Sequence, residues 1–165
     1  MKDEYPLGPV FDFLQRLWQL NQAMERMSSG MEKRLGVTAQ QRLIIRCVGR
    51  YPGLTAGRLA RLLHLDPGTV SASLARLEKK GLLHRRKDPR DARRASLGLS
   101  PEGRLLDRPD VGTIEAAVER LLEATPPRDL NAATAVIGQL TGLLRSAALV
   151  HSVERGAVSP GVQPR

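Results

Sequence analysis

The sequence predicts a mainly α-helical fold with one small β-hairpin. Apolar residues recur at helical spacing along most of the chain, whereas residues 82–99 have the pattern of two short strands around a turn. Aromatic residues make up 3% of the 165 residues, so the core must be built from Leu, Val, Ile and Ala. A chain of this length is expected to form about one domain.

Two helices are expected in the N-terminal third. Apolar residues at intervals of three, four or seven predict a helix over residues 10–35, and Gly36 is suited to end it. Thr38 is expected to cap a second helix, and Gln41 three residues later would complete a capping box. That helix should end at residues 51–53 and present one apolar side, which consists of Leu43, Ile44, Cys47 and Val48.

The next segment predicts two short helices joined by a tight turn. Thr55 is expected to cap the helix over 55–64, which would bury Leu59, Leu62 and Leu63. Asp66 is expected to cap the helix over 67–80, and Pro67 suits its first position. Together they have the pattern of a helix-turn-helix, with the inner side of the second helix formed by Val70, Leu74 and Leu77.

A β-hairpin is expected directly after this pair of helices. Residues 82–86 and 94–99 predict its strands, and the basic segment 87–93 predicts its tip, so the hairpin forms a wing. Ser100 and Pro101 begin a further helix that is interrupted near Pro109 and Gly112 and resumes at Ile114. The expected regions are an N-terminal helix over 1–36, a winged helix-turn-helix over 37–103, C-terminal helices over 104–150 and a flexible tail over 151–165.

The net charge of +9 predicts a polyanionic partner, either nucleic acid or an anionic membrane. The segment from Leu54 to Arg104 contains twelve Lys or Arg and five Asp or Glu, a net +7, whereas the flanking segments are nearly balanced. No apolar run approaches the roughly 18 residues of a membrane span, and the polar N-terminus does not resemble a secretory signal. We therefore expect a cytoplasmic protein that binds double-stranded DNA and no membrane.

Two sets of residues are predicted to contact DNA. Small or polar side chains on the outer face of the second helix would let its backbone approach the major groove, although a solvated surface helix can have the same composition. Arginines at the wing tip fit a narrow minor groove, and Asp88 or Asp91 would orient one of them by a paired hydrogen bond. The helix set is Pro67, Gly68, Thr69, Ser71, Ala72, Ser73 and Arg76, and the wing set is Arg86, Lys87, Asp88, Arg90, Arg93 and Arg94.

The same stretch resembles the multiple-antibiotic-resistance regulator (MarR) family. The sequence LEKKGLLHR at residues 77–85 resembles the family's motif at the end of the second helix and the start of the first strand. DPRDAR at 88–93 resembles the family's wing, and LSPEG at 99–103 resembles the start of its next helix. TAQQ at residues 38–41 also resembles the family. The strong match covers about a third of the chain.

The resemblance implies that the N- and C-terminal helices are dimerisation helices. It implies a homodimer on a pseudopalindromic operator and a small aromatic or phenolic ligand bound between the dimerisation and DNA-binding parts. Ala72 departs from the pattern because the family often has a longer side chain there. Pro109 and Gly112 also depart, because the family usually has a long straight helix at this place.

Other residues suggest separate hypotheses. Trp18, Met24 and Met27 are candidates for lining a ligand pocket, but core or dimer packing is favoured. Cys47, the only cysteine, is expected to be a buried packing residue rather than a redox sensor. The three histidines are scattered, and no catalytic motif is present, so we expect no metal, no cofactor and no enzymatic activity.

The favoured function is a homodimeric transcriptional regulator, acting as a repressor that a ligand releases from its operator. The first alternative is an architectural protein that binds DNA with little sequence preference. The second is a winged-helix adaptor that binds proteins and no DNA duplex.

Overall fold

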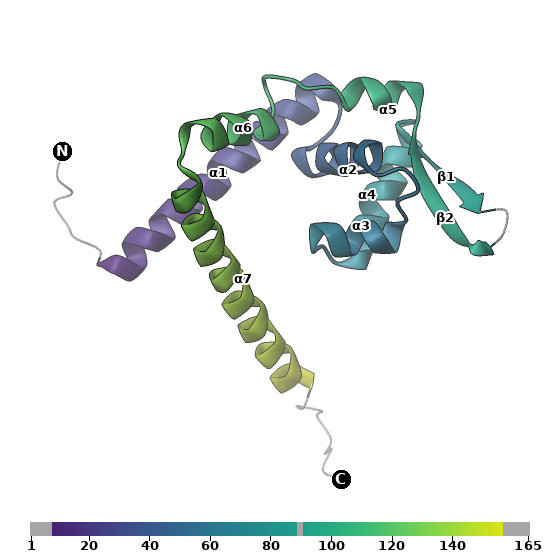
Figure 1. Cartoon of the computed structure of the whole chain (residues 1–165). Helices are drawn as coiled ribbons and strands as arrows, with labels where there is room; N and C mark the ends of the chain where they lie inside the picture. Colours follow the sequence, from purple (N-terminus) through teal and green to yellow (C-terminus); the bar gives the residue numbers. More distant parts are fainter. Residues whose placement is uncertain (1–7, 89–90, 157–165) are drawn as a thin grey trace, which may run out of the picture. The chain divides into compact units, whose positions relative to one another are not determined.

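The computed structural model describes the backbone of residues 8–88 and 91–156, and the side chains of residues 8–86 and 95–147 (Figure 1). The fold is mainly α-helical with one antiparallel two-stranded hairpin, which confirms the predicted fold class. Within the described residues, none of the helices combines the length and apolar character needed to cross a bilayer. The elements are α1 (Pro9–Leu35), α2 (Ala39–Arg50), α3 (Ala56–Leu63), α4 (Pro67–Lys79), β1 (Leu83–Asp88), β2 (Asp91–Leu99), α5 (Pro101–Leu106), α6 (Ile114–Ala124) and α7 (Pro127–Gly156).

The predicted capping residues Gly36, Thr38 and Thr55 are confirmed. Gly36 ends α1 in the left-handed conformation at φ 73°, which glycine adopts at little cost. Thr38 and Gln41 form the complete capping box of α2. Thr55 caps α3 by accepting a hydrogen bond from the backbone N–H of Arg58. These caps fix where each helix begins, and therefore which of its faces turns inward.

The chain divides into two compact units. One ends at Ala117 and contains α1 to α5, the hairpin and the start of α6, and the other begins at Val118 and contains the rest of α6 and α7. In the second unit, α7 continues to Gly156, beyond the expected end at residue 150. Its helices expose many apolar side chains, including Leu121, Leu122, Ile137, Leu143 and Leu144.

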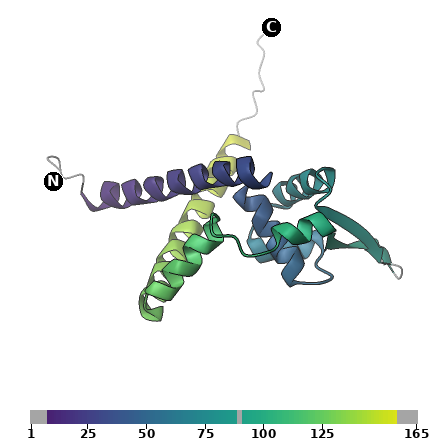
Figure 2. The ribbon, with the colours of Figure 1, turned by 90° about the horizontal axis from the view of Figure 1, so that it is seen from above.

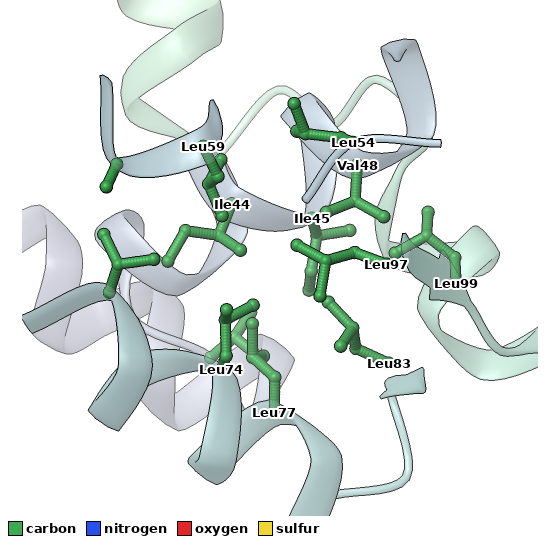
Figure 3. Close-up of a cluster of buried hydrophobic side chains, with 13 residues drawn as sticks. Ile44, Ile45, Val48, Leu54, Leu59, Leu74, Leu77, Leu83, Leu97 and Leu99 are labelled. Carbon is green, nitrogen blue, oxygen red and sulfur yellow. The ribbon is translucent and has the colours of Figure 1, made fainter. Parts of the chain in front are cut away.

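The core of the first unit lies where α2, α3, α4 and the hairpin meet (Figure 3). Ile44 and Ile45 of α2 are completely buried, and they lie among leucines from the other elements. The labelled leucines of this core are Leu54, Leu59, Leu74, Leu77, Leu83, Leu97 and Leu99.

Two apolar residues expected in the core are exposed instead. Leu43 is 42% exposed, because the buried stripe of α2 runs through Gln41, Ile44, Ile45 and Val48 and leaves Leu43 to one side. Leu62 is 45% exposed, because α3 is buried along Leu59 and Ala60. The helical period was therefore predicted correctly, but the centre of each buried face was wrong.

The base of the hairpin is fastened to the helix-turn-helix. Leu83 pairs with Leu99 across the two strands, and both side chains are buried in the core. The backbone N–H of Leu97 donates to the carbonyl of Leu54 at 2.7 Å, and Thr55 bridges to Ser96. The far end of the hairpin extends away from α2, α3 and α4 in both views (Figures 1 and 2). The wing is therefore anchored at its base beside the start of α3.

The predicted interruption after α5 is a complete break, which spans Asp107 to Thr113. Pro109 lies in it and cannot donate a backbone hydrogen bond to a continuous helix. Arg42 of α2 is 2% exposed and donates to Glu115 at 2.9 Å and to the carbonyl of Arg108 at 2.7 Å. It also donates to the carbonyl of Leu106. This buried guanidinium thus provides donors for two backbone carbonyls at the break, those of Leu106 and Arg108.

Two further arginines hold the same segment. Arg34 at the end of α1 forms a two-point contact with Asp110 at 2.8 and 2.9 Å, and it also donates to the carbonyl of Gly112 at 3.0 Å. Arg46 of α2 pairs with Asp107 at 3.0 Å. The break between α5 and α6 is therefore a fixed loop held by side chains from α1 and α2.

Removing the buried guanidinium should destabilise the protein strongly. We expect Arg42→Met to lower the free energy of unfolding by about 3 kcal/mol, because Glu115 and two carbonyls would lose their donor. Arg50→Met, at an exposed position of the same helix, should change it by less than about 0.5 kcal/mol. Urea unfolding of both variants measures this, and equal stabilities would contradict the account.

The Arg34–Asp110 contact should give stability a specific dependence on pH. Hydrogen bonds from Arg34 and from the backbone N–H of Gly112 lower the pKa of Asp110 from 3.8 to about 2. A carboxyl whose pKa is lowered by folding contributes stability above its unfolded pKa and loses that contribution as pH falls through the folded pKa. The advantage of the wild type over Asp110→Asn should therefore be complete above pH 4 and vanish towards pH 2.

Denaturant titrations between pH 2 and 6 measure this difference. In an Arg34→Gln background, Asp110→Asn should have a much smaller pH-dependent effect, because the main cause of the pKa shift is gone. A stability difference that stays constant across this pH range would show that the contact contributes nothing through ionisation.

Candidate DNA-binding interface

The N-terminus of helix α4, the second helix of the helix-turn-helix, is capped. Pro67 occupies its first turn, and the Asp66 carboxylate accepts hydrogen bonds from the backbone N–H groups of Gly68 at 2.8 Å and Thr69 at 3.2 Å. These two amides are thus already bound to an anionic group. Contacts with a phosphate at this end would therefore depend on side chains.

The outer face of α4 presents six of the seven residues predicted to contact DNA. They are small, polar or basic, and all are exposed: Pro67, Gly68, Thr69, Ser71, Ala72 and Arg76. The inner face is occupied by Val70, Leu74 and Leu77, which are buried in the core. The exposed face has no side chain longer than threonine before Arg76, so another surface can approach its backbone closely.

Ser73 does not belong to this outer face. It is 5% exposed and lies three residues after Val70 and four before Leu77, which places it on the buried side of the helix. The expectation that Ser73 faces outward was wrong, because the helical period places it on the same side as Val70 and Leu77. Ser73 is therefore a packing residue.

Further exposed cations surround the helix-turn-helix. Arg58 and Arg61 are exposed on α3, and Lys79 is exposed at the end of α4. None of the three is among the residues predicted to contact DNA. For Arg58 and Arg61, the signal in the sequence is their position on the polar side of an amphipathic helix.

An ion pair joins the base of the hairpin to α4. The Nε atom of Arg85 donates to both carboxylate oxygens of Glu78, at 3.0 and 3.2 Å. Arg86, the next residue, is exposed and is the one predicted wing contact whose side chain is described. The Arg85–Glu78 pair restrains the base of the hairpin relative to the helix that precedes it.

The remaining predicted wing contacts lie outside what the structure describes. Arg90 lies wholly outside the described residues, and only the backbone is described for Lys87, Asp88, Arg93 and Arg94. The predicted pairing of Asp88 or Asp91 with a wing arginine therefore stays a prediction. The described ends of β1 and β2 extend away from the core.

The three candidates for a ligand pocket lie on one helix and are exposed. Trp18 is 61% exposed on α1, and Met24 and Met27 are also exposed, so this chain alone does not enclose them. Cys47 lies partly buried beside the core, where desolvation raises the pKa of its thiol. It borders a surface hollow of about 510 Å³ together with Arg46, Gly49, Arg50, Tyr51 and Asp107. The sequence did not predict this hollow.

Histidine, cysteine and acidic side chains do not form a metal site in the described part of the chain. No group of three or more His, Cys, Asp or Glu side chains there is arranged to hold an ion. His64 ends α3 in the left-handed conformation at φ 51°, and His84 lies over Gly98 of the opposite strand. The position of each histidine therefore follows from the local backbone, a helix end for His64 and a strand pair for His84.

A helix-turn-helix with a small polar outer face, followed by an anchored hairpin, defines the winged helix-turn-helix class of domain. The family model described as MarR family matches residues 35–94, which include α2, α3, α4 and most of the hairpin. The match to the MarR family model thus falls on the same stretch whose motifs resemble that family.

Two curated relatives are similar over about half of the chain. The organic hydroperoxide resistance transcriptional regulator of Bacillus subtilis (strain 168) is 29% identical over 90 residues, which cover 54% of this chain and 61% of the relative. Transcriptional regulator HosA of Escherichia coli O111:H- is 30% identical over 86 residues, covering 52% and 64%. The chain thus spans less than two thirds of either relative. Both are transcriptional regulators by name.

Solved structures show the same fold over most of the chain. The S. aureus MepR–DNA complex has a TM-score of 0.67 at 22% identity, covering 83% of this chain and 99% of that one. Streptomyces coelicolor PcaV with its natural ligand has a TM-score of 0.62 at 24% identity, covering 79% and 89%. At these identities the likeness concerns the fold.

Proposed function

We propose that this chain is a homodimeric DNA-binding transcriptional regulator that represses by occupying a pseudopalindromic operator in double-stranded DNA. The observation that carries the proposal is the outer face of α4. The short polar side chains of this face are exposed, whereas Leu74 and Leu77 of the inner face are buried in the core. A helix of this kind can lie in the major groove, about 12 Å wide, without losing its packing.

Each exposed residue of α4 has a role in this account. The hydroxyls of Thr69 and Ser71 can donate to or accept from base edges, and Ala72 can contact a thymine methyl. Arg76, one to two turns further on, can reach a guanine or a phosphate. The wing arginines Arg86, Arg90, Arg93 and Arg94 would follow the adjacent minor groove, where guanidinium groups respond to its negative potential.

The apolar surface of the terminal helices supports a homodimer. On α1, large apolar side chains are exposed in a single chain, and α6 and α7 expose several leucines. Surface of this kind on a single chain indicates an interface. A twofold dimer would present two copies of α4 to two half-sites, which explains why we propose a pseudopalindrome. The exposed set on α1 is Val10, Phe11, Phe13, Trp18, Leu20, Met24 and Met27.

The proposal also includes control by a small ligand. We propose that a small aromatic or phenolic acid binds where a second chain would cover Trp18, Met24 and Met27, and that it favours a dimer unsuited to the operator. The family resemblance supports this, and PcaV, of the same fold, was solved with its natural ligand. Peroxide sensing is not proposed, because desolvation raises the pKa of Cys47 and disfavours the reactive thiolate.

The DNA-binding proposal predicts a specific effect at Arg76. Arg76→Ala should weaken binding to duplex DNA from the region upstream of the protein's own gene by about tenfold, the scale of one good base contact. Arg50→Ala removes the same charge from an exposed position on α2 and should weaken binding much less. Fluorescence anisotropy between about 50 and 200 mM salt should also show affinity falling steeply with salt.

Three results would change the proposal in different ways. Equal losses for the two variants would remove α4 from the interface. Equal affinity for upstream and random duplexes of the same length would favour the architectural alternative. Failure to bind any duplex at low salt would contradict DNA binding and favour the protein adaptor.

The dimer proposal predicts that a charge on the apolar side of α1 prevents association. Trp18→Glu would place a carboxylate among apolar side chains of the interface, so we expect it to shift the protein to the monomer. Gln19→Glu adds the same charge at the next exposed position and should leave the dimer intact. Light scattering after size exclusion measures both masses, and a dimeric Trp18→Glu variant would contradict the role of α1.

A further inference from the structure

Polar contacts in the first unit concentrate at one place, the turn between α1 and α2. We call residues 34–42 the α1–α2 corner. Two of its side chains, Gln41 and Arg42, are buried although they are polar or charged, and they are neighbours in the sequence. Burying such groups costs free energy unless they are bonded, so their partners show what this corner holds in place.

On one side, the corner holds the end of α4. Lys80 ends that helix, and its own backbone N–H bonds to the carbonyl of Arg76. Its Nζ atom donates to the carbonyl of Gly36 at 2.6 Å and to Oε1 of Gln41 at 3.2 Å. The Gly36 carbonyl lies at the C-terminal end of α1, where the helix dipole favours a cation.

Gln41 connects this contact to the start of α2. Its Oε1 atom also accepts from the backbone N–H of Thr38 at 3.4 Å as part of the capping box. One amide oxygen thus joins the cap of α2 to the ammonium group at the end of α4. The proposed recognition helix is therefore bonded directly to the junction at which the proposed dimerisation helix α1 ends.

On the other side, the corner holds the segment between α5 and α6 and the first turn of α6. Arg42 bonds to Glu115 and to the carbonyls of Leu106 and Arg108, and Arg34 bonds to Asp110 and Gly112. The corner is therefore restrained from a second direction. The end of α4, which is bonded to the corner through Lys80, is therefore attached to a restrained part of the structure.

We propose that Lys80 is a positioning residue for DNA binding. By joining the end of α4 to Gly36 and Gln41, it fixes the recognition helix to α1, so that the dimer holds its two recognition helices at one separation. This inference rests on the proposed function. It adds to that proposal that the Lys80 ammonium group sets the spacing of the two half-sites that the dimer can bind. Lys80 does so through its bonds to the α1–α2 corner and not by contact with DNA.

The neighbouring Lys79 provides a matched control. It is exposed at the last position of α4, it carries the same charge, and the described structure shows no bond between it and the corner. Lys79→Met and Lys80→Met therefore remove equal charge from adjacent positions. Only the second removes the contact with Gly36 and Gln41.

The experiment uses the upstream duplex and two derivatives in which one base pair is added or removed at the centre of symmetry. One base pair moves a half-site by about 3.4 Å and rotates it by about 35°. The wild type and Lys79→Met should lose about tenfold or more in affinity on the altered duplexes. Lys80→Met should bind the original duplex about tenfold more weakly than Lys79→Met and lose less than about threefold on the derivatives. Lys80→Arg should restore the discrimination.

A second measurement needs no DNA. Nitroxide labels at Ala72→Cys in a Cys47→Ser background report the distance between the two copies of α4 in the dimer. The distribution should be narrow in the Lys79→Met protein and clearly broader in Lys80→Met.

Three results would overturn the inference. The first is unchanged spacing discrimination in Lys80→Met with an unchanged thermal midpoint of unfolding, which would show that Lys80 contributes only its charge. The second is unchanged spacing discrimination with a lower thermal midpoint, which would make its role structural only. The third is an unchanged distance distribution. A wild-type protein that binds no duplex would instead contradict the proposed function, and the label distances would still test the restraint on α4.

Discussion

The burial of Ile44 and Ile45 against Leu74 and Leu77 is the packing contact on which the rest of the structure depends. These four side chains are completely buried, and they join α2 to α4. Because the inner face of α4 is fully occupied, its outer face is fixed without any contact from a ligand. The hairpin completes the same core through Leu83, Leu97 and Leu99, so the wing and the helix cannot move far apart without opening apolar surface to water.

Polar groups restrain the same elements at their ends, where the apolar core stops. Asp66 holds the beginning of α4, Lys80 holds its end, and Glu78 ties it to the wing through Arg85. These contacts contribute less free energy than the core, because most of them are partly exposed. Their contribution is geometric, since charged and capping groups accept only a few arrangements. The core therefore keeps α4 folded, and the polar contacts define the direction in which it points.

Local features could be predicted from the sequence, and distant contacts could not. Thr38, Asp66 and Ser100 were correctly predicted as caps, because capping depends on residues within a few positions of each other. The errors at Leu43, Leu62 and Ser73 arose because helical period alone does not locate the centre of a buried face. The bonds of Arg42 to Glu115 and of Lys80 to Gly36 join residues 73 and 44 positions apart, and no local pattern marks them.

The most direct test of the account is to select duplexes bound by the full-length protein from a random pool and to sequence them. The account predicts enrichment of an inverted repeat whose half-sites lie about one helical turn, or 10 base pairs, apart, with A·T-rich flanks where the wings would enter the minor groove. Enrichment of a single unpaired site, or of no sequence at all, would contradict a dimer that reads two half-sites through α4.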